Sequence, residues 1–287
     1  MQKKVIAIQS DLGTVDGRAA RLIGTIKRVD ASLDVCVTEN KCPKGDAVVA
    51  STLLYSSLPF FPEGTVYLSL VERAEGGNPP CAALTNDNKI ILTPDNGTLT
   101  VWIHRYGLKA LRHLNTKSCP AEMNPYAYFA AQIARGAVSY ESLGESYPVS
   151  QAQTFAMYPP TVGPGTVECG IFSVLENFGN LNLTVSIEDF DRSGIQAGDR
   201  VRVTIERSGS VRFDQIIPYD RSFGFAELGA SILFNGSSGY LGLGMNQASF
   251  ANAYLKDRFE PAGAVAEYRV RIVKQTQTFR AIERKRK

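Results

Sequence analysis

Strand-length apolar runs alternate with segments of helical spacing through the first half of the chain. The predicted strands are residues 4–9, 33–38, 65–71, 81–85 and 89–93. The predicted helices are residues 16–28, 46–57 and 125–135, the last with proline in its first turn and Gly136 just beyond its end. Asp87-Asn88 joins two of the strands as a hairpin-like turn. This alternation predicts an α/β domain with a mostly parallel sheet covered by helices.

The pattern changes after residue 148. Four prolines and two glycines fall between residues 148 and 165, which is typical of a connection between domains. Beyond it the predicted elements are strands, at residues 168–175, 181–187, 200–206, 231–234 and 267–274. We therefore expect an α/β domain over residues 1–150, a linker over 151–165, and a smaller, mainly antiparallel β domain over 166–287.

Composition and charge exclude several classes of protein. The 287 residues are 44% hydrophobic and 21% charged, as in an ordinary globular protein. A net charge of +3 does not favour nucleic-acid binding, and the basic tail, Arg284–Lys287, is expected to be a solvated chain end rather than a phosphate contact. Five cysteines without metal-type spacing predict a reduced, cytoplasmic setting and no metal site. We expect no membrane association, since no apolar stretch reaches transmembrane length.

Three polar clusters follow apolar runs, at residues 10–16, 177–180 and 235–240. Polar side chains at strand ends are how α/β folds build sites for small polar ligands. In the first cluster, the carboxylate of Asp11 can accept two hydrogen bonds, as a ribose diol would offer them. Asp16 is either the cap of the following helix or a partner for an ammonium group.

The other two clusters carry amides and hydroxyls. Asn180 can donate and accept at a purine edge while Phe178 lies against the ring, although glycine and asparagine are equally typical of a tight turn. Ser237 and Ser238 can hydrogen-bond a carboxylate, or they can simply form a turn. A fourth stretch, residues 94–97, is a strand-to-helix turn of modest functional weight.

Taken together, these stretches resemble the S-adenosylmethionine (SAM) hydroxide adenosyltransferase family, relatives of the fluorinating and chlorinating enzymes that attack SAM at C5′. The matching stretches are Ser10-Asp11-Leu12-Gly13, Phe61–Val66, Pro94-Asp95-Asn96-Gly97, Phe178-Gly179-Asn180, Ser237–Leu241 and Asn246-Gln247. The resemblance implies an N-terminal α/β domain, a C-terminal β domain and a homotrimer. It also implies that SAM, as substrate or ligand and with no further cofactor, binds between the N-terminal domain of one chain and the C-terminal domain of its neighbour.

The resemblance also implies roles for single residues. Asp11 would hold the ribose hydroxyls, and Asp16 the methionine amine. Asn180 would read adenine beside Phe178, while Ser237 and Ser238 would take the methionine carboxylate. Asn96 and Phe223 complete the expected substrate-binding set. Serine at position 238, where the halogenating branch has arginine, is similar to the water-using branch.

The chain departs from the family at the residues thought to orient water, which are an Asp, an Arg and a His. Glu72 stands in place of the aspartate, and Glu122 lies in the stretch where the family has histidine. These two glutamates are the catalytic candidates, although Glu72 is equally compatible with a solvated loop charge. We expect cleavage of SAM by water to adenosine and methionine. The alternatives are a non-catalytic SAM- or adenosine-binding protein and an enzyme with a changed nucleophile; halide is the least expected nucleophile, because Glu122 would repel it.

Overall fold

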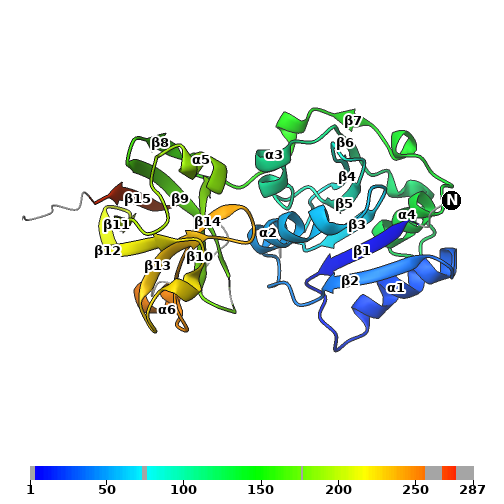
Figure 1. The fold of residues 1–287 in the computed structure, drawn as a ribbon. Helices are drawn as coiled ribbons and strands as arrows, with labels where there is room; N and C mark the ends of the chain where they lie inside the picture. The colour runs from blue at the N-terminus through cyan, green and yellow to red at the C-terminus, as the bar shows by residue number, and fades with distance from the viewer. Residues whose placement is uncertain (1–3, 73–75, 176, 256–266, 276–287) are drawn as a thin grey trace, which may run out of the picture. The chain divides into compact units, whose positions relative to one another are not determined.

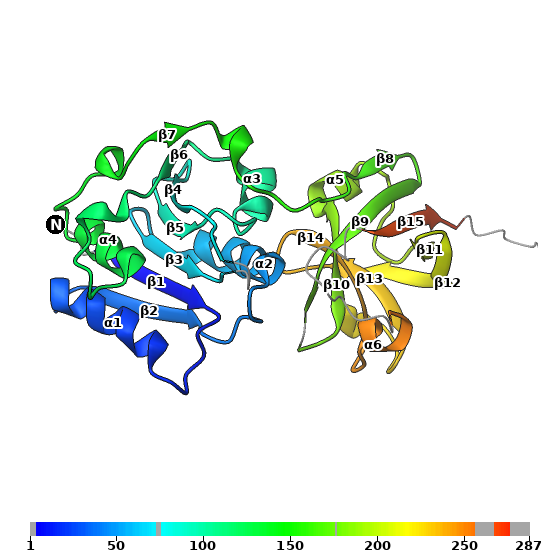
Figure 2. The same cartoon turned by 180° about the vertical axis from the view of Figure 1, so that it is seen from behind.

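The computed structural model describes residues 4–72, 76–175, 177–255 and 267–275. The chain divides into two compact units, Met1–Phe155 and Ala156–Lys287, and each is described by itself. Figures 1 and 2 show the elements of both units from two sides. The basic tail lies outside the described residues.

The N-terminal unit is built on a seven-stranded mixed sheet. In spatial order its strands are β2 (Asp34–Glu39), β1 (Val5–Ser10), β3 (Val66–Leu70), β5 (Ile90–Pro94), β4 (Pro80–Leu84), β6 (Ala110–His113) and β7 (Ser146–Tyr147). The pairs from β2 to β5 are parallel. The pairs from β5 to β7 are antiparallel. The prediction of an α/β unit is confirmed, but the mostly parallel sheet must be corrected to a mixed one, because the predicted β4–β5 hairpin turns the chain back beside its own strand.

Helices cover both faces of this sheet (Figure 1). They are α1 (Arg18–Val29), α2 (Ala47–Ser57), α3 (Thr100–Tyr106) and α4 (Pro125–Ala134). Successive residues of a strand face opposite sides. Accordingly, Ile6 and Ile8 pack in the core under α1 and α4, whereas Ala7 packs in the core under α2 and α3.

Helix α1 begins two residues later than the pattern predicts. Gly17, at φ 74°, immediately precedes it, so the left-handed backbone at this glycine sets the start of the helix. Asp16 is therefore not the cap. Helix α2 begins at Ala47, and the side chain of Asp46 caps it by accepting hydrogen bonds from the N–H groups of Val48 and Val49.

The C-terminal unit is a barrel-like sheet. Its strands, in spatial order, are β10 (Asn180–Ser186), β14 (Tyr240–Met245), β13 (Ser231–Asn235), β12 (Ser210–Asp220), β11 (Arg200–Arg207), β15 (Tyr268–Lys274), β9 (Thr166–Leu175) and β8 (Thr161–Gly163). β9 also pairs with β10, which closes the sheet on itself. Among the described strands of this unit, only the pair β12–β13 is parallel. The predicted mainly antiparallel β unit is confirmed.

Short elements complete this unit: α5 (Ile187–Asp191), α6 (Phe250–Tyr254) and the 3₁₀ turn η5 (Phe223–Phe225). Strand β8 lies inside the segment expected as a linker, because residues 161–163 pair with 166–168 across Pro164-Gly165. None of the helices in the described ranges is both long and apolar enough to span a bilayer.

Candidate functional site

In the N-terminal unit, Asp11 follows directly after β1. Its N–H donates to the carbonyl of Leu70, at the end of the neighbouring strand β3, at 3.3 Å. Its carboxylate oxygen Oδ2 accepts the N–H of Gly45 at 2.9 Å. These two bonds fix the carboxylate at the carboxyl edge of the parallel strands, and its other oxygen, Oδ1, has no hydrogen-bond partner among the described residues.

The loop that follows β2 folds over the start of the Asp11 segment. The carbonyl of Asn40 accepts the N–H of Gly13 at 2.8 Å, and the N–H of Cys42 donates to the carbonyl of Ser10 at 3.1 Å. Burial, together with the negative charges of Glu39 and Asp11, raises the pKa of Cys42 to about 12. The thiol therefore stays protonated at neutral pH and is a packing group rather than a nucleophile.

Asn96 and Glu72 lie at the ends of the next two parallel strands. Asn96 is 4% exposed, and its amide nitrogen donates to the carbonyl of Val71 at 2.7 Å. Its amide oxygen accepts the N–H and the hydroxyl of Thr98 at 3.1 and 2.8 Å. Glu72, next to Val71, is exposed. The structure thus brings Asp11, Asn96 and Glu72 to one edge of the sheet, where Asn96 holds the strand ends together and the two carboxylates remain available for chemistry.

Tyr126 is a residue that the sequence reasoning missed. It lies in the first turn of α4, directly after the stretch that holds Glu122. Burial raises its pKa most, and negative charge on Cys81 and on Glu72 raises the pKa further. The phenol is therefore protonated at neutral pH. The only feature of the sequence that points to Tyr126 is its position next to the stretch where the family has histidine.

Asp16 and Glu122 each pair with an arginine. Both oxygens of Asp16 accept from Arg18, the backbone N–H at 3.1 Å and the guanidinium at 2.6 Å, and these bonds lower the pKa of the exposed carboxyl. Glu122 faces Arg28 at 3.4 Å in a groove between α1 and residues 121–124. Arg28 is in the last turn of α1, about 15 Å along the helix from Arg18.

In the C-terminal unit, Asn180 begins β10 after a tight turn. The carbonyl of Leu175 accepts the N–H groups of Phe178 and Gly179 at 3.1 and 2.7 Å, so residues 177–180 form the turn that their composition predicts. Phe178 is 61% exposed, whereas Asn180 is 5% exposed. The side-chain oxygen of Asn180 is buried and has no hydrogen-bond partner among the described residues. An orphaned buried acceptor of this kind is uncommon in folded proteins.

The surroundings of the Asn180 oxygen are tightly fitted. A Cβ added to Gly244 would overlap this oxygen and would lie 3.2 Å from the ring of Phe234, so only glycine leaves room for both. The Phe234 ring packs edge-on against Phe223 at 5.6 Å, and Phe223 is 41% exposed. The structure therefore brings Asn180 and Phe223 together through Phe234, which, like Gly244, the sequence reasoning did not single out.

A polar row along β10 links Asn180 to the serine cluster. Every second residue of this strand is polar and nevertheless buried: Asn180, Asn182, Thr184 and Ser186. The nitrogen of Asn182 donates to the hydroxyl of Ser173 at 2.9 Å, and a Cβ on Gly236 would lie 3.8 Å from the oxygen of Asn182 and 3.6 Å from the hydroxyl of Ser238. Ser238 thus lies near this row, whereas Ser237 is exposed at the tip of the β13–β14 hairpin.

The chemistry of these groups is that of hydrogen bonding and proton transfer. The described residues contain no group of three or more His, Cys, Asp or Glu side chains placed to hold a metal ion. Two carboxylates at a strand edge suit hydroxyl groups and a water molecule. An amide beside exposed aromatic rings suits a flat, hydrogen-bonding ring.

Comparison with known proteins covers most of the chain. The family model "SAM hydroxide adenosyltransferase N-terminal domain" matches residues 6–144, and the model of the C-terminal domain matches residues 173–258. A fluorinase from Actinoplanes sp. (strain N902-109) is 26% identical, covering 87% of this chain and 93% of its own length. An (R)-S-adenosyl-L-methionine hydrolase from Salinispora arenicola is 29% identical over 94 residues, which are 33% of this chain and 36% of its own length.

Solved structures share the fold. An uncharacterized conserved protein from Thermotoga maritima superposes with a TM-score of 0.76 at 21% identity, covering 93% of this chain and 99% of its own. A conserved hypothetical protein from Thermus thermophilus gives 0.72 at 24% identity, covering 94% and 100%. With both family models matched in order over the two units, the chain belongs to the SAM hydroxide adenosyltransferase family.

Proposed function

We propose that the protein binds SAM and cleaves it at C5′ with water, yielding adenosine and methionine. The observation that carries the proposal is the pair of carboxylates at one sheet edge in a chain that matches this family. Asp11 is hydrogen-bonded to Leu70 at the end of β3, and Glu72 follows two residues after that strand end. One carboxylate can hold the nucleoside while the other faces water.

Asp11 is proposed to bind the ribose diol. The bond from Gly45 holds one of its oxygens, and the other is left for a ribose hydroxyl. Asp16 and Asn96 are also proposed to contact SAM, and both would first exchange the bonds that they make in this structure. Asp16 would have to give up its bonds with Arg18 to hold the methionine ammonium, and the amide oxygen of Asn96 is already used by Thr98.

The C-terminal unit is proposed to recognise the base and the carboxylate. The orphaned oxygen of Asn180 would accept a hydrogen bond from the exocyclic amine of adenine, which is the donor that this acceptor lacks. The exposed rings of Phe178 and Phe223 would lie against the base. Ser237 and Ser238 would bind the methionine carboxylate. We further propose a homotrimer, in which copies of the chain supply both sets of residues to one ligand.

In the proposed step, the oxygen of water forms a bond to C5′ as the C5′–S bond breaks. The electron pair of that bond goes to the sulfonium sulfur, which leaves as the neutral thioether of methionine. The proton released by water goes to Glu72 and from there to solvent. Because the sulfonium is already a good leaving group, the protein chiefly orients water and excludes bulk solvent.

Water is favoured over halide by the charge of Glu72. A carboxylate beside C5′ attracts the hydrogens of water and repels an approaching anion. Glu122 repels a halide less than the sequence predicts, because its carboxylate faces the guanidinium of Arg28. It remains the second catalytic candidate.

The function is tested by incubating the purified protein with SAM in ¹⁸O-water, with and without fluoride or chloride. We expect adenosine and methionine in equal amounts, with the label in the 5′-hydroxyl of adenosine. Heat-denatured protein is the control. Formation of 5′-halo-5′-deoxyadenosine would show a changed nucleophile, and tight binding of SAM without product would show a binding protein that does not catalyse.

A Gly244→Ala substitution tests the proposed adenine site. The new methyl group would overlap the Asn180 oxygen and press on Phe234, so both side chains must move. Losing one neutral hydrogen bond weakens binding by up to about tenfold, and we expect a loss of that size in adenosine affinity by calorimetry. Gly163→Ala is the matched control, since a Cβ there meets nothing within 4 Å. Unchanged adenosine affinity in Gly244→Ala would remove Asn180 from the site.

A further inference from the structure

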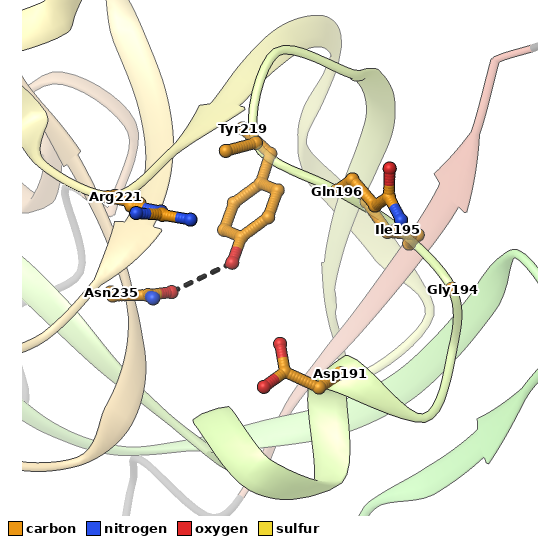
Figure 3. Close-up of a pocket in the computed structure, with 8 residues that line it drawn as sticks. Asp191, Gly194, Ile195, Gln196, Tyr219, Arg221 and Asn235 are labelled. Atoms are coloured by element: carbon orange, nitrogen blue, oxygen red, sulfur yellow. Dashed lines mark hydrogen bonds between the residues drawn. The ribbon is translucent and has the colours of Figure 1, made fainter.

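The C-terminal unit also has a polar pocket that is not lined by any of the residues proposed to bind SAM. It has a volume of about 560 Å³ and is lined by Asp191, by residues 194–197, by Tyr219 and Arg221 at the end of β12, and by Asn235 at the end of β13. We call it the barrel-end pocket. Figure 3 shows its polar side chains. The ends of β-barrels are common positions for small-ligand sites, and this volume lies within the range typical of them.

The strand pattern separates this pocket from the Asn180 site. Neighbouring residues of a strand point to opposite faces, so Asn235 faces away from Phe234. Phe234 packs on the Asn180 side, whereas Tyr219 and Leu233 belong to the core inside the sheet. Asn235 lies two residues after Leu233, and Arg221 lies two residues after Tyr219. Both are therefore on the same side of their chain segment as these core residues, at the end of the barrel. Ile195, which is 2% exposed, and Tyr219, which is 3% exposed, border the pocket on the side of the core.

The pocket carries two opposite charges that do not pair with each other. Among the described residues, the carboxylate of Asp191 and the guanidinium of Arg221 have no ion-pair partner within 4.0 Å, although salt bridges form elsewhere in this unit. Figure 3 shows the two groups approaching the Tyr219 hydroxyl from different sides. The pKa of Tyr219 is raised chiefly by burial and next by the charge of Asp191, whereas Asn235 and Arg221 act in the opposite direction. Both charged groups are thus close to one buried hydroxyl.

Hydrogen bonding in the pocket is directional. The hydroxyl of Tyr219 donates to the amide oxygen of Asn235 at 2.9 Å (Figure 3). This bond holds the oxygen of the Asn235 amide and leaves its nitrogen as a donor, and Asn235 and Arg221 lie on the same side of the Tyr219 ring (Figure 3). Because the Tyr219 hydroxyl already donates its hydrogen to Asn235, its oxygen can only accept a hydrogen bond from a ligand. The pocket therefore offers donors at one end and acceptors at the other.

We propose that the barrel-end pocket binds a small zwitterionic α-amino acid. Arg221 and the nitrogen of Asn235 bind its carboxylate, and Asp191 with the Tyr219 oxygen binds its ammonium group. A ligand that carries both charges satisfies both ends, whereas a simple anion would face Asp191 and a simple cation would face Arg221. Binding here requires no turnover of SAM and stands apart from the proposed reaction.

The test screens the proteinogenic L-amino acids against the full chain by thermal shift at millimolar concentration, followed by calorimetry of the tightest binder. We expect at least one to bind, and its methyl ester and its N-acetyl derivative, which each lack one charge, to bind about tenfold more weakly or worse. Arg221→Gln and Asp191→Asn should each weaken binding of the parent amino acid by about tenfold or more. Arg192→Gln is the matched control, because this exposed neighbour pairs with Asp189 and does not line the pocket.

Two outcomes would overturn the proposal. One is that no amino acid binds. The other is that binding survives both substitutions, which would place the ligand elsewhere, for example at the proposed methionine position of the SAM site. Release of adenosine from SAM is measured on the same variants, and we expect it to be unchanged in Arg221→Gln and Asp191→Asn. A failure of the amino-acid site is thereby distinguished from a failure of the hydrolase proposal.

Discussion

Glu72→Gln is expected to lower the rate of adenosine formation from SAM by about 10²–10⁴-fold, the usual contribution of a positioned general base, with SAM affinity changed little. Glutamine keeps the size of the side chain and removes the group that would take the proton from water. The exposed position of Glu72 after β3 means that the substitution should not disturb the core. Product formation is measured by chromatography, and SAM affinity by calorimetry.

Two further variants locate the effect. Glu63→Gln changes an exposed glutamate that accepts from the amide of Asn88, and it should leave turnover unchanged. Glu122→Gln tests the other candidate, which faces Arg28. If turnover falls in Glu122→Gln and persists in Glu72→Gln, the role of the base belongs to Glu122 and the proposed position of water is wrong.

Asp11→Asn is expected to weaken the binding of SAM and adenosine by about 100-fold, because hydrogen bonds to a charged carboxylate are each worth about 1.5–3 kcal/mol. Asparagine can still accept the N–H of Gly45 through its oxygen, so the loop after β2 should stay in place. The rest of the side chain then presents a donor to the ribose hydroxyls in place of an acceptor. Calorimetry with adenosine measures the loss.

A ligand without the diol makes this experiment specific. If Asp11 holds the ribose hydroxyls, Asp11→Asn and the unchanged protein should bind 2′,3′-dideoxyadenosine with nearly equal affinity. Asp34→Asn, at the exposed start of β2, is the matched control. An equal loss of affinity for adenosine and for the dideoxy compound would mean that Asp11 acts on the shape of the loop and not on the diol.

The elements of the fold follow closely from local patterns, whereas their order in space does not. The apolar run that becomes β1 and the proline-started helix α4 lie near their predicted residues, because spacing and capping act within one element. The antiparallel β4–β5 pair follows from the predicted hairpin, whereas β6 beside β4 and β7 beside β6 depend on pairing between residues far apart in the sequence. The strand and helix pattern alone therefore does not predict how the antiparallel half of the sheet continues.

The candidate site was predictable where it depends on strand ends. Asp11 and Glu72 follow parallel strands that are neighbours in the sheet, so placing both strands also places their final residues. The surroundings of Asn180 were not predictable in the same way. The alternation of polar and apolar residues in β10 predicts a solvated polar face, but the structure buries all four polar residues. Other segments of the chain cover this face, and the sequence of the strand itself does not indicate that cover. Gly244 gains its importance only from what lies opposite it.

The closure of the C-terminal sheet by the β9–β10 pairing has a consequence for how the protein behaves in concentrated solution. Within the closed part of the ring the strands pair with their neighbours, so a strand from another molecule could be added chiefly along β8 and along the part of β12 that pairs with β11 alone. The N-terminal sheet does present such a border at β2, where the acidic residues Asp34 and Glu39 stand at the two ends of the strand. Like charges at that border repel a second copy, so electrostatics disfavours strand addition at β2, whereas pairing within the ring disfavours it over much of the C-terminal sheet.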